Sequence, residues 1–181
     1  MSNFNPQFAK IGDILVYNKT ISQEQLDKAL SEQKNSNDKL GRVLIKLGYI
    51  NENDLINAYS QQMGHRAIDY EEILKSDLEV TALLSEDFAK DKKIIALKKS
   101  DSSIIVAMED PEDLSTLDAV KKLTNLNPEI FISSKTDIEK ALEVLYDRIK
   151  KSGEVESAIS NISIIKGDDE DSDELDLGTE E

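Results

Sequence analysis

The chain has 181 residues, of which 37 are acidic and 22 basic, and it contains neither cysteine nor tryptophan. The formal net charge of −15 repels phosphate backbones, which excludes a general role in binding nucleic-acid polymers. The absence of cysteine excludes disulfides, a thiol nucleophile and a cysteine-ligated metal. No stretch approaches the roughly 18 consecutive apolar residues of a membrane span. The N-terminus also lacks a signal-peptide pattern, so we expect a cytoplasmic protein without direct membrane insertion.

A tandem repeat occupies the first third of the chain. Residues 10–33 (the first copy) and 39–62 (the second copy) align without a gap at a constant offset of 29. Eight aligned pairs are identical, namely Lys10/Lys39, Gly12/Gly41, Leu15/Leu44, Ile21/Ile50, Leu26/Leu55, Ala29/Ala58, Ser31/Ser60 and Gln33/Gln62. A gapless match of this length predicts two copies of one structural unit.

Each copy is predicted to form a helical hairpin. In the first copy, Ser22 and Gln25 have the spacing of a capping box at a helix start. In the second copy, Gly48 is a residue that can end a helix in the left-handed conformation, and Asn51 can cap the next helix. The first copy has Lys19 at the position of Gly48, which predicts a less favourable turn. The second helix of each copy has one apolar face ending in an amide, made of Leu26, Ala29, Leu30 and Gln33 or of Leu55, Ala58, Tyr59 and Gln62.

After Gly64 the pattern changes to short helices (70–74, 78–83 and 86–90) followed by β-rich runs at 93–98 and 103–108. Asp110-Pro111 is expected to open an amphipathic helix with Leu114, Leu117, Val120 and Leu123 facing inward. A strand at 129–132 and a closing helix from about 136 to 148 follow. The strand–helix–strand order predicts a right-handed crossover and a mixed sheet.

The predicted fold class is α+β. A bundle of two tandem helical hairpins (residues 1–64) precedes a small α/β subdomain (65–150) with a mixed three-stranded sheet flanked by helices. Residues 167–181 hold nine acidic side chains and no basic one, so we expect residues 151–181 to be an acidic disordered linker.

Enzyme signatures are absent from the sequence. The seven glycines form neither a phosphate-binding P-loop nor a dinucleotide-binding fingerprint, and His65 is the only histidine. We therefore expect a protein that is not an enzyme and that uses no metal or cofactor.

The repeat permits an inference about a ligand. Each copy places a lysine and a glycine at a helix start, where a phosphate is favoured, and an apolar face ending in an amide. The matching ligand is elongated and twofold, with two bases and two phosphates. In the alternative interpretation, which these patterns leave open, both apolar faces are the hairpins' mutual core.

Both copies resemble the tandem motif R-L-G-x-x-L-x-x-x-G-x-x-x-x-x-x-L-x-x-x-L-x-x-Q in the N-terminal domain of type IV pilus extension ATPases and type II secretion ATPases (the MshE/PilB/GspE family). The resemblance continues through Ile94–Leu97, Ser103–Pro111 and the helix from Asp113, and it covers about residues 8–148. In that family the doubled motif binds cyclic di-GMP. Residues 152–181 resemble the linker that precedes the family's ATPase domain.

The resemblance implies two half-sites for cyclic di-GMP. The first consists of Lys10, Ile11, Gly12, Leu26, Leu30 and Gln33, and the second of Lys39, Leu40, Gly41, Arg42, Leu55, Tyr59 and Gln62. Asp110 is implied as a contact to a guanine edge. The chain departs from the motif because lysine replaces both arginines, Tyr59 replaces a leucine and Lys19 replaces the turn glycine.

The function implied is that of a cyclic di-GMP-binding regulatory domain. Its partners are the ligand, the protein's own C-terminal ATPase domain and inner-membrane platform or pilus assembly proteins at the cytoplasmic face of the membrane. The alternative is a docking module that links the motor to the platform protein without binding a nucleotide. A ligand site requires the Gln33 and Gln62 amides to face a groove, whereas a docking module tolerates glutamate there.

Overall fold

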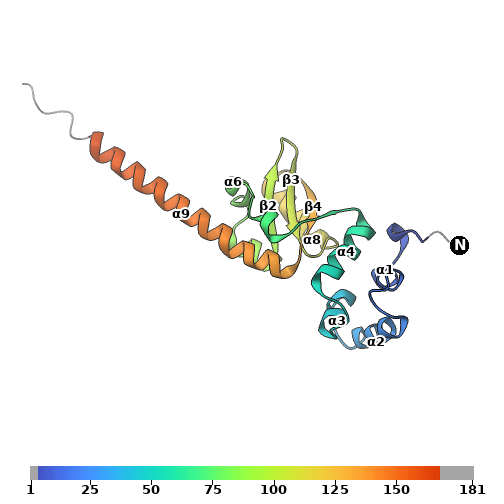
Figure 1. Ribbon diagram of the computed structural model, residues 1–181. Coiled ribbons are helices and arrows are strands. Elements are labelled where there is room, and N and C mark those ends of the chain that lie inside the picture. Colours follow the sequence, from blue (N-terminus) through green and yellow to red (C-terminus); the bar gives the residue numbers. More distant parts are fainter. Residues whose placement is uncertain (1–3, 168–181) are drawn as a thin grey trace, which may run out of the picture. The chain divides into compact units, whose positions relative to one another are not determined.

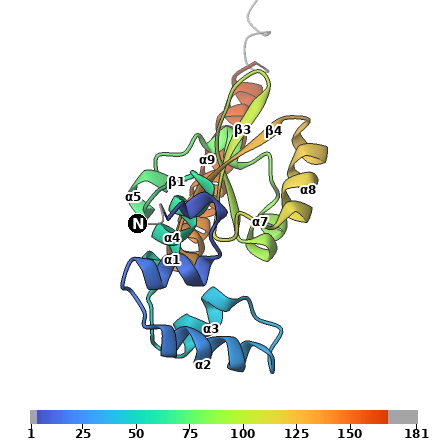
Figure 2. The same cartoon turned by 90° about the vertical axis from the view of Figure 1, so that its right-hand side faces the viewer.

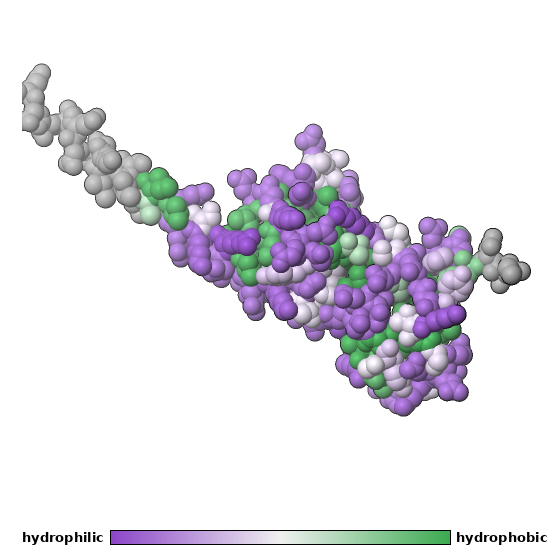
Figure 3. Space-filling model, in the orientation of Figure 1, coloured by the Kyte–Doolittle hydropathy of each residue, from purple (hydrophilic) through white to green (hydrophobic). Residues whose placement is uncertain are grey.

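The computed structural model describes residues 4–167, with residues 161–167 described as helical backbone only. Residues 4–146 form one compact unit, and a second unit begins at residue 147 (Figure 1). Hydrophilic side chains cover most of the face of residues 4–146 that Figure 3 shows.

The helical part of the first unit is built from the two copies of the repeat. A short 3-10 helix, η1, precedes four α-helices: η1 (Pro6–Phe8), α1 (Ile11–Tyr17), α2 (Gln23–Gln33), α3 (Leu40–Lys46) and α4 (Glu52–Met63). The helix α1 packs against α4, and α2 packs against α3 (Figure 2). Each copy is two helices joined by a turn, as the sequence predicts, but its helices pack mainly against those of the other copy.

The caps and turns of the two hairpins repeat one another. Ser22 forms the predicted capping box with Gln25, and Asn51 caps α4 with Asp54 in the same arrangement. Gly48 has the left-handed φ of 72° that its position predicts. Lys19, its counterpart in the first copy, adopts the same conformation with φ of 60°. A lysine therefore occupies a backbone conformation that favours glycine.

A mixed sheet follows the helical part within the same unit. Its elements are β1 (Arg66–Ala67), α5 (Tyr70–Ile73), α6 (Leu78–Thr81), α7 (Glu86–Lys92), β2 (Ile94–Lys99), β3 (Ser103–Met108), α8 (Leu114–Thr124) and β4 (Asn127–Ile132). The strand order is β1-β4-β3-β2, in which β2 and β3 are antiparallel and the other two pairs are parallel. The crossover from β3 through α8 to the parallel β4 confirms the predicted mixed sheet.

The sheet has four strands where the sequence predicts three. The additional strand, β1, contains only Arg66 and Ala67, which pair with Phe131 and Ile132 of β4. Two residues are too few to show the alternation of a strand, so the sequence pattern could not reveal it. Ile132 also belongs to the buried cluster of the helical part, so the hairpins and the sheet share a core.

The orientation of α8 differs from the sequence prediction. Val120 is fully buried and Leu117 packs against the buried cluster beside it, but Leu114 and Leu123 are 68% and 60% exposed. The expectation that these two leucines face inward is therefore wrong. Asp113, rather than Asp110, caps α8 through the Thr116 amide. At 3.6 residues per turn, Leu114 and Leu123 lie about 180° apart around the helix and cannot both face inward. The buried residues of α8 are Thr116 and Val120.

The last helix, α9 (Lys135–Gly167), begins in the first unit and continues into the second. Its buried side chains in the first unit have the spacing of one helical face and are Ile138, Ala141, Leu142, Leu145 and Tyr146. Residues 151–167 are helical where the sequence analysis expects a disordered linker. They contain aliphatic and charged helix formers and no proline, which is compatible with a helix. The rest of the expected linker, residues 168–181, lies outside the described residues.

Candidate functional site

Two neighbouring pockets contain most of the residues that the sequence analysis selects. The first pocket has a volume of about 290 Å³ and is lined by Lys10, Ile11, Gln33, Lys39, Leu40, Gly41, Tyr59, Gln62 and Glu112. The second pocket has a volume of about 250 Å³ and is lined by Asn37, Asp38, Lys39, Arg42, Leu55, Tyr59, Glu109 and Asp110. Lys39 and Tyr59 line both pockets, so the two are adjacent. Both copies of the repeat contribute to the first pocket.

Three selected residues line neither pocket. Gly12 and Leu26 are buried against each other, and Leu30 is 40% exposed on α2. A Cβ atom on Gly12 would lie 2.6 Å from Cδ1 of Leu26. A Cβ atom on Gly41 would lie equally close to Cδ1 of Leu55, its counterpart in the second copy. The glycine of each copy therefore leaves room for the leucine side chain of the same copy, and the two residues pack against each other.

The two glutamines at the ends of α2 and α4 exchange hydrogen bonds between the copies. Nε2 of Gln33 donates to the carbonyl oxygen of Asp38 at 3.3 Å, and Nε2 of Gln62 donates to the carbonyl oxygen of Ala9 at 2.9 Å. Asp38 and Ala9 directly precede Lys39 and Lys10. Each copy's glutamine thus binds the backbone before the other copy's lysine, which gives the site approximate twofold symmetry.

The side-chain oxygen of Gln62 has no partner. Oε1 is buried and accepts no hydrogen bond among the described residues. A buried acceptor without a donor costs free energy, so this atom is suited to a ligand that brings an N–H group.

The cations of the second copy are paired with carboxylates of residues 109–112, here called the acidic loop. Lys39, the N-cap residue of α3, pairs with Asp110 and lies 3.6 Å from Glu112. Arg42 pairs with Glu109. Arg42 also lies 3.8 Å from Glu52. Four carboxylates therefore surround the two cations of this half of the site.

Lys10 occupies the equivalent N-cap position of α1 in the first copy. It forms no ion pair with any residue of the described range 4–167. The two copies therefore agree in backbone geometry but differ in how their lysines are neutralised.

These charges change the pKa values of the groups they contact. Burial lowers the pKa of Lys39, but the hydrogen bond and charge of Asp110, together with Glu112, outweigh it and raise the pKa above its ordinary value. Burial raises the pKa of Tyr59 to about 12, with a further contribution from Asp110 and Glu112 against the opposing charge of Arg42. Lys39 is therefore charged and Tyr59 neutral at physiological pH.

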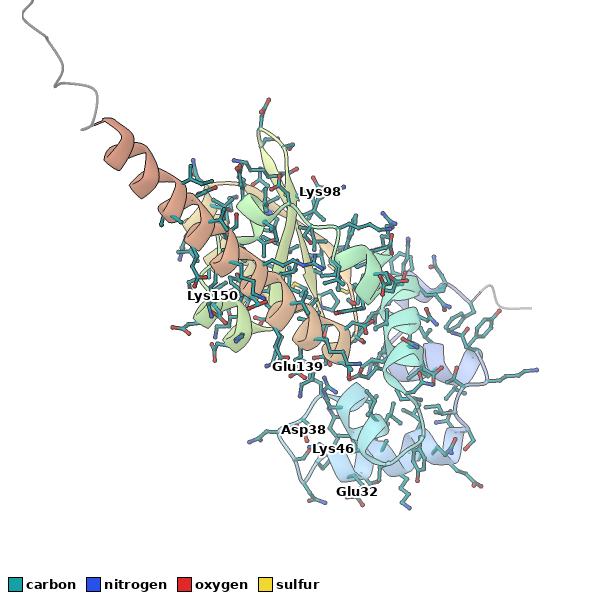
Figure 4. All side chains as sticks on the ribbon, turned by 60° about the vertical axis from the view of Figure 1, so that its left-hand side comes forward. Glu32, Asp38, Lys46, Lys98, Glu139 and Lys150 are labelled. Atoms are coloured by element: carbon teal, nitrogen blue, oxygen red, sulfur yellow. The ribbon has the colours of Figure 1, made fainter. Side chains whose placement is uncertain are left out.

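Four lining residues were not selected from the sequence: Asn37, Asp38, Glu109 and Glu112. The last two flank Asp110 in the run Glu109-Asp110-Pro111-Glu112, so their proximity to Asp110 was the available signal. Asp38 belongs to the α2–α3 connection, where it pairs with Lys46 of α3 (Figure 4). This ion pair links the connection to the end of α3.

The described part of the chain has neither a cluster of metal ligands nor a helix that could span a membrane. Among residues 4–167, no group of three histidine, cysteine or carboxylate side chains is placed to hold a metal ion. No helix within that range combines the length and apolar character needed to cross a membrane.

Comparison with known proteins places these features in context. The profile of the MshEN domain matches residues 68–151. The solved structure of MshE with cdg (cyclic di-GMP) has a TM-score of 0.69 and 30% identity, and the match covers 76% of this chain and 99% of that one. The N-terminal domain of XpsE shares the fold, with a TM-score of 0.63 and 21% identity over 79% of this chain and 97% of that one.

Two longer relatives are described as type IV pilus assembly ATPase PilB. The protein from Myxococcus xanthus is 29% identical over 170 residues, which is 92% of this chain and 30% of the relative. The protein from Thermus thermophilus is 27% identical over 146 residues, which is 81% of this chain and 16% of the relative. The chain therefore spans less than a third of the length of either relative.

Proposed function

Because this chain belongs to the MshEN domain family, we propose that it is a cyclic di-GMP-binding regulatory domain of a type IV pilus or type II secretion assembly ATPase. The observation that carries the proposal is the 30% identity to MshE with cdg, which extends over 99% of that chain. The ligand is the only small molecule required, and the domain uses no metal or cofactor.

The chemistry of the two pockets supports this proposal. The ligand's two phosphates need cations, which Lys10, Lys39 and Arg42 supply. The unpartnered Oε1 of Gln62 is matched to an N–H donor, and the Watson–Crick edge of guanine presents such donors. The carboxylate of Asp110 can accept from the same type of edge. The buried ring of Tyr59, which lines both pockets, offers an apolar surface for a base.

The remaining proposed site residues contribute apolar surface and close packing. Ile11 and Leu40 line the first pocket and Leu55 lines the second. Gly12, Gly41 and Leu26 shape the half-sites through packing, and Leu30 presents an exposed apolar side chain beside Gln33. Lysine at positions 10 and 39 keeps the charge of the motif arginines without their planar fork, and Arg42 supplies one such fork.

Binding would clamp the two hairpins and bias the ATPase domain of a longer protein. Such coupling between sites is typically worth about 1–3 kcal/mol. An inner-membrane platform protein is the proposed partner of the assembled motor.

The test is isothermal titration calorimetry of the full 181-residue chain with cyclic di-GMP, with GTP and linear pGpG as control ligands. We expect saturable binding of about one ligand per chain, which Gln33→Ala combined with Gln62→Ala abolishes. Gln61→Ala is the matched control, because Gln61 is exposed and lines neither pocket. Absence of heat with the unaltered chain would contradict the proposal.

A docking module is the second candidate function, and a separate observation favours it. Phe8 and Tyr17 are 89% and 62% exposed, and Tyr17 stacks on Phe4 with ring centroids 4.0 Å apart. Exposed aromatic side chains are typical of protein interfaces. If this function is correct, Gln33→Glu with Gln62→Glu leaves binding to a platform protein unchanged, and Phe8→Ser with Tyr17→Ser weakens it.

A further inference from the structure

The two half-sites are equivalent in backbone but not in charge. The hydrogen bonds of Gln33 and Gln62, and the close packing of Gly12 and Gly41, follow the repeat. The aligned charges do not, because position 42 holds arginine in the second copy whereas its counterpart in the first copy is Asp13. The half-site of the second copy therefore has one more cation, and it is also the half-site that the acidic loop contacts.

The acidic loop connects β3 to α8, and its carboxylates contact Lys39 and Arg42 of the second copy. Glu109 lines the second pocket and pairs with Arg42, whereas Glu112 lines the first pocket and lies 3.6 Å from Lys39. The side chain of Glu112 is 51% exposed and that of Glu109 is 21% exposed. Both carboxylates therefore border the space that the ligand would enter.

A phosphate diester and a carboxylate compete for the same cations. Lys10, Lys39 and Arg42 bring three positive charges, and the four carboxylates of Glu52, Glu109, Asp110 and Glu112 bring four negative charges, so this set has a net charge of −1. A ligand with two negative charges therefore gains little long-range attraction from it. It must exchange places with a carboxylate to reach Lys39 or Arg42.

We propose that Glu109 and Glu112 act as internal competitors for the ligand's phosphates and thereby set the affinity of the site. The ligand contacts Lys10 first. It completes its contacts with the second copy only when the carboxylates of the acidic loop break their ion pairs with Arg42 and Lys39. This inference rests on the proposed function. It adds that binding is coupled to a change in the β3–α8 connection.

The test compares cyclic di-GMP binding by the unaltered chain, by Glu112→Gln and by Glu109→Gln with Glu112→Gln. Each substitution keeps the side-chain shape and removes one competing charge, so we expect each to raise affinity by about fivefold. Glu129→Gln is the matched control, because Glu129 is exposed on β4 and lines neither pocket. Thermal unfolding of each variant verifies that the fold is retained.

Salt dependence provides a second, independent measurement. Because the site charges of the unaltered chain nearly cancel, its affinity changes little between about 50 mM and about 500 mM salt. The double variant has a net charge of about +1 at this site, so its affinity falls as salt screens the attraction.

The outcomes separate this inference from the proposed function. Tighter binding by the glutamine variants with a new salt dependence supports the inference. Binding by the unaltered chain that the variants leave equal or weaker overturns the inference and leaves the proposed function intact. Absence of binding by every chain overturns both.

Discussion

Gln62 holds the segment before the first copy to the end of the second, because its Nε2 donates to the carbonyl oxygen of Ala9 at 2.9 Å. The two residues are 53 positions apart in the chain. Gln33 makes the equivalent bond to Asp38 across only five positions. The same motif residue thus closes a long loop in one copy and a short one in the other, so the Gln62 bond constrains far more of the chain.

Replacing Gln62 by glutamate is expected to destabilise the domain. A carboxylate cannot donate to the Ala9 carbonyl, and it places a charge at a partly buried position. We expect Gln62→Glu to lower the free energy of unfolding by about 1–3 kcal/mol, measured by urea denaturation at pH 7.

Gln61→Glu is the matched control for this prediction. Gln61 is exposed, and its Oε1 accepts from Nδ2 of Asn18 at 3.0 Å, a bond that glutamate keeps. The control is expected to change stability by no more than about 0.5 kcal/mol. Equal losses in the two variants would contradict the importance of the Gln62–Ala9 bond.

Lys19→Gly is expected to stabilise the domain. Lys19 has a left-handed φ of 60°, which glycine adopts without the steric cost of a Cβ atom. Glycine also makes the unfolded chain more flexible, so the net gain is expected to be about 0.5–1 kcal/mol in urea denaturation. The reverse change at the counterpart position, Gly48→Lys, should lose a similar amount. A loss of stability in Lys19→Gly would show that its side chain contributes more than its backbone costs.

Gly41→Ala is expected to destabilise the second hairpin. Its new Cβ atom would lie 2.6 Å and 2.9 Å from the two Cδ atoms of the buried Leu55. Overpacking of this kind costs about 1–3 kcal/mol, and combining it with Leu55→Val should cost less than the sum of the single changes. Gly153→Ala is the control, since a Cβ there meets nothing within 4 Å. Thermal unfolding of the four variants measures the coupling, and strict additivity would contradict the contact.

The raised pKa of Tyr59 predicts that the domain loses stability at alkaline pH. Its pKa of about 12 in the folded protein lies above the ordinary value of 10, so the unfolded chain releases this proton first. The contribution of Tyr59 to stability should therefore be constant below about pH 10 and fall from there to about pH 12, by at most about 1.4 kcal/mol per pH unit.

Tyr59→Phe removes this contribution and should make the alkaline loss smaller. Tyr17→Phe is the control, because the Tyr17 side chain is 62% exposed and stacked on Phe4. The measurement is the free energy of unfolding from chemical denaturation, at pH values between about 8 and about 11.5 that are roughly one unit apart. Identical pH profiles for Tyr59→Phe and the unaltered chain would contradict the assignment.

The sequence alone determined the local structure of this protein and its family. The repeat at a constant offset predicted two hairpins, and Ser22, Asn51 and Gly48 predicted their caps and one turn, all of which the structure confirms. These predictions succeeded because capping and turn formation depend on residues within a few positions of each other. The tandem motif also predicted membership of the MshE/PilB/GspE family, which the comparisons confirm.

Only the tertiary structure decided which residues meet across the chain. The two-residue strand β1 exists because β4 offers it a partner, and Leu114 and Leu123 are exposed because α8 packs against the sheet through Val120 and Leu117. The placement of the acidic loop against Lys39 and Arg42 joins residues about 70 positions apart. Such pairings depend on how the hairpins and the sheet pack together, and no local pattern in the sequence records that packing.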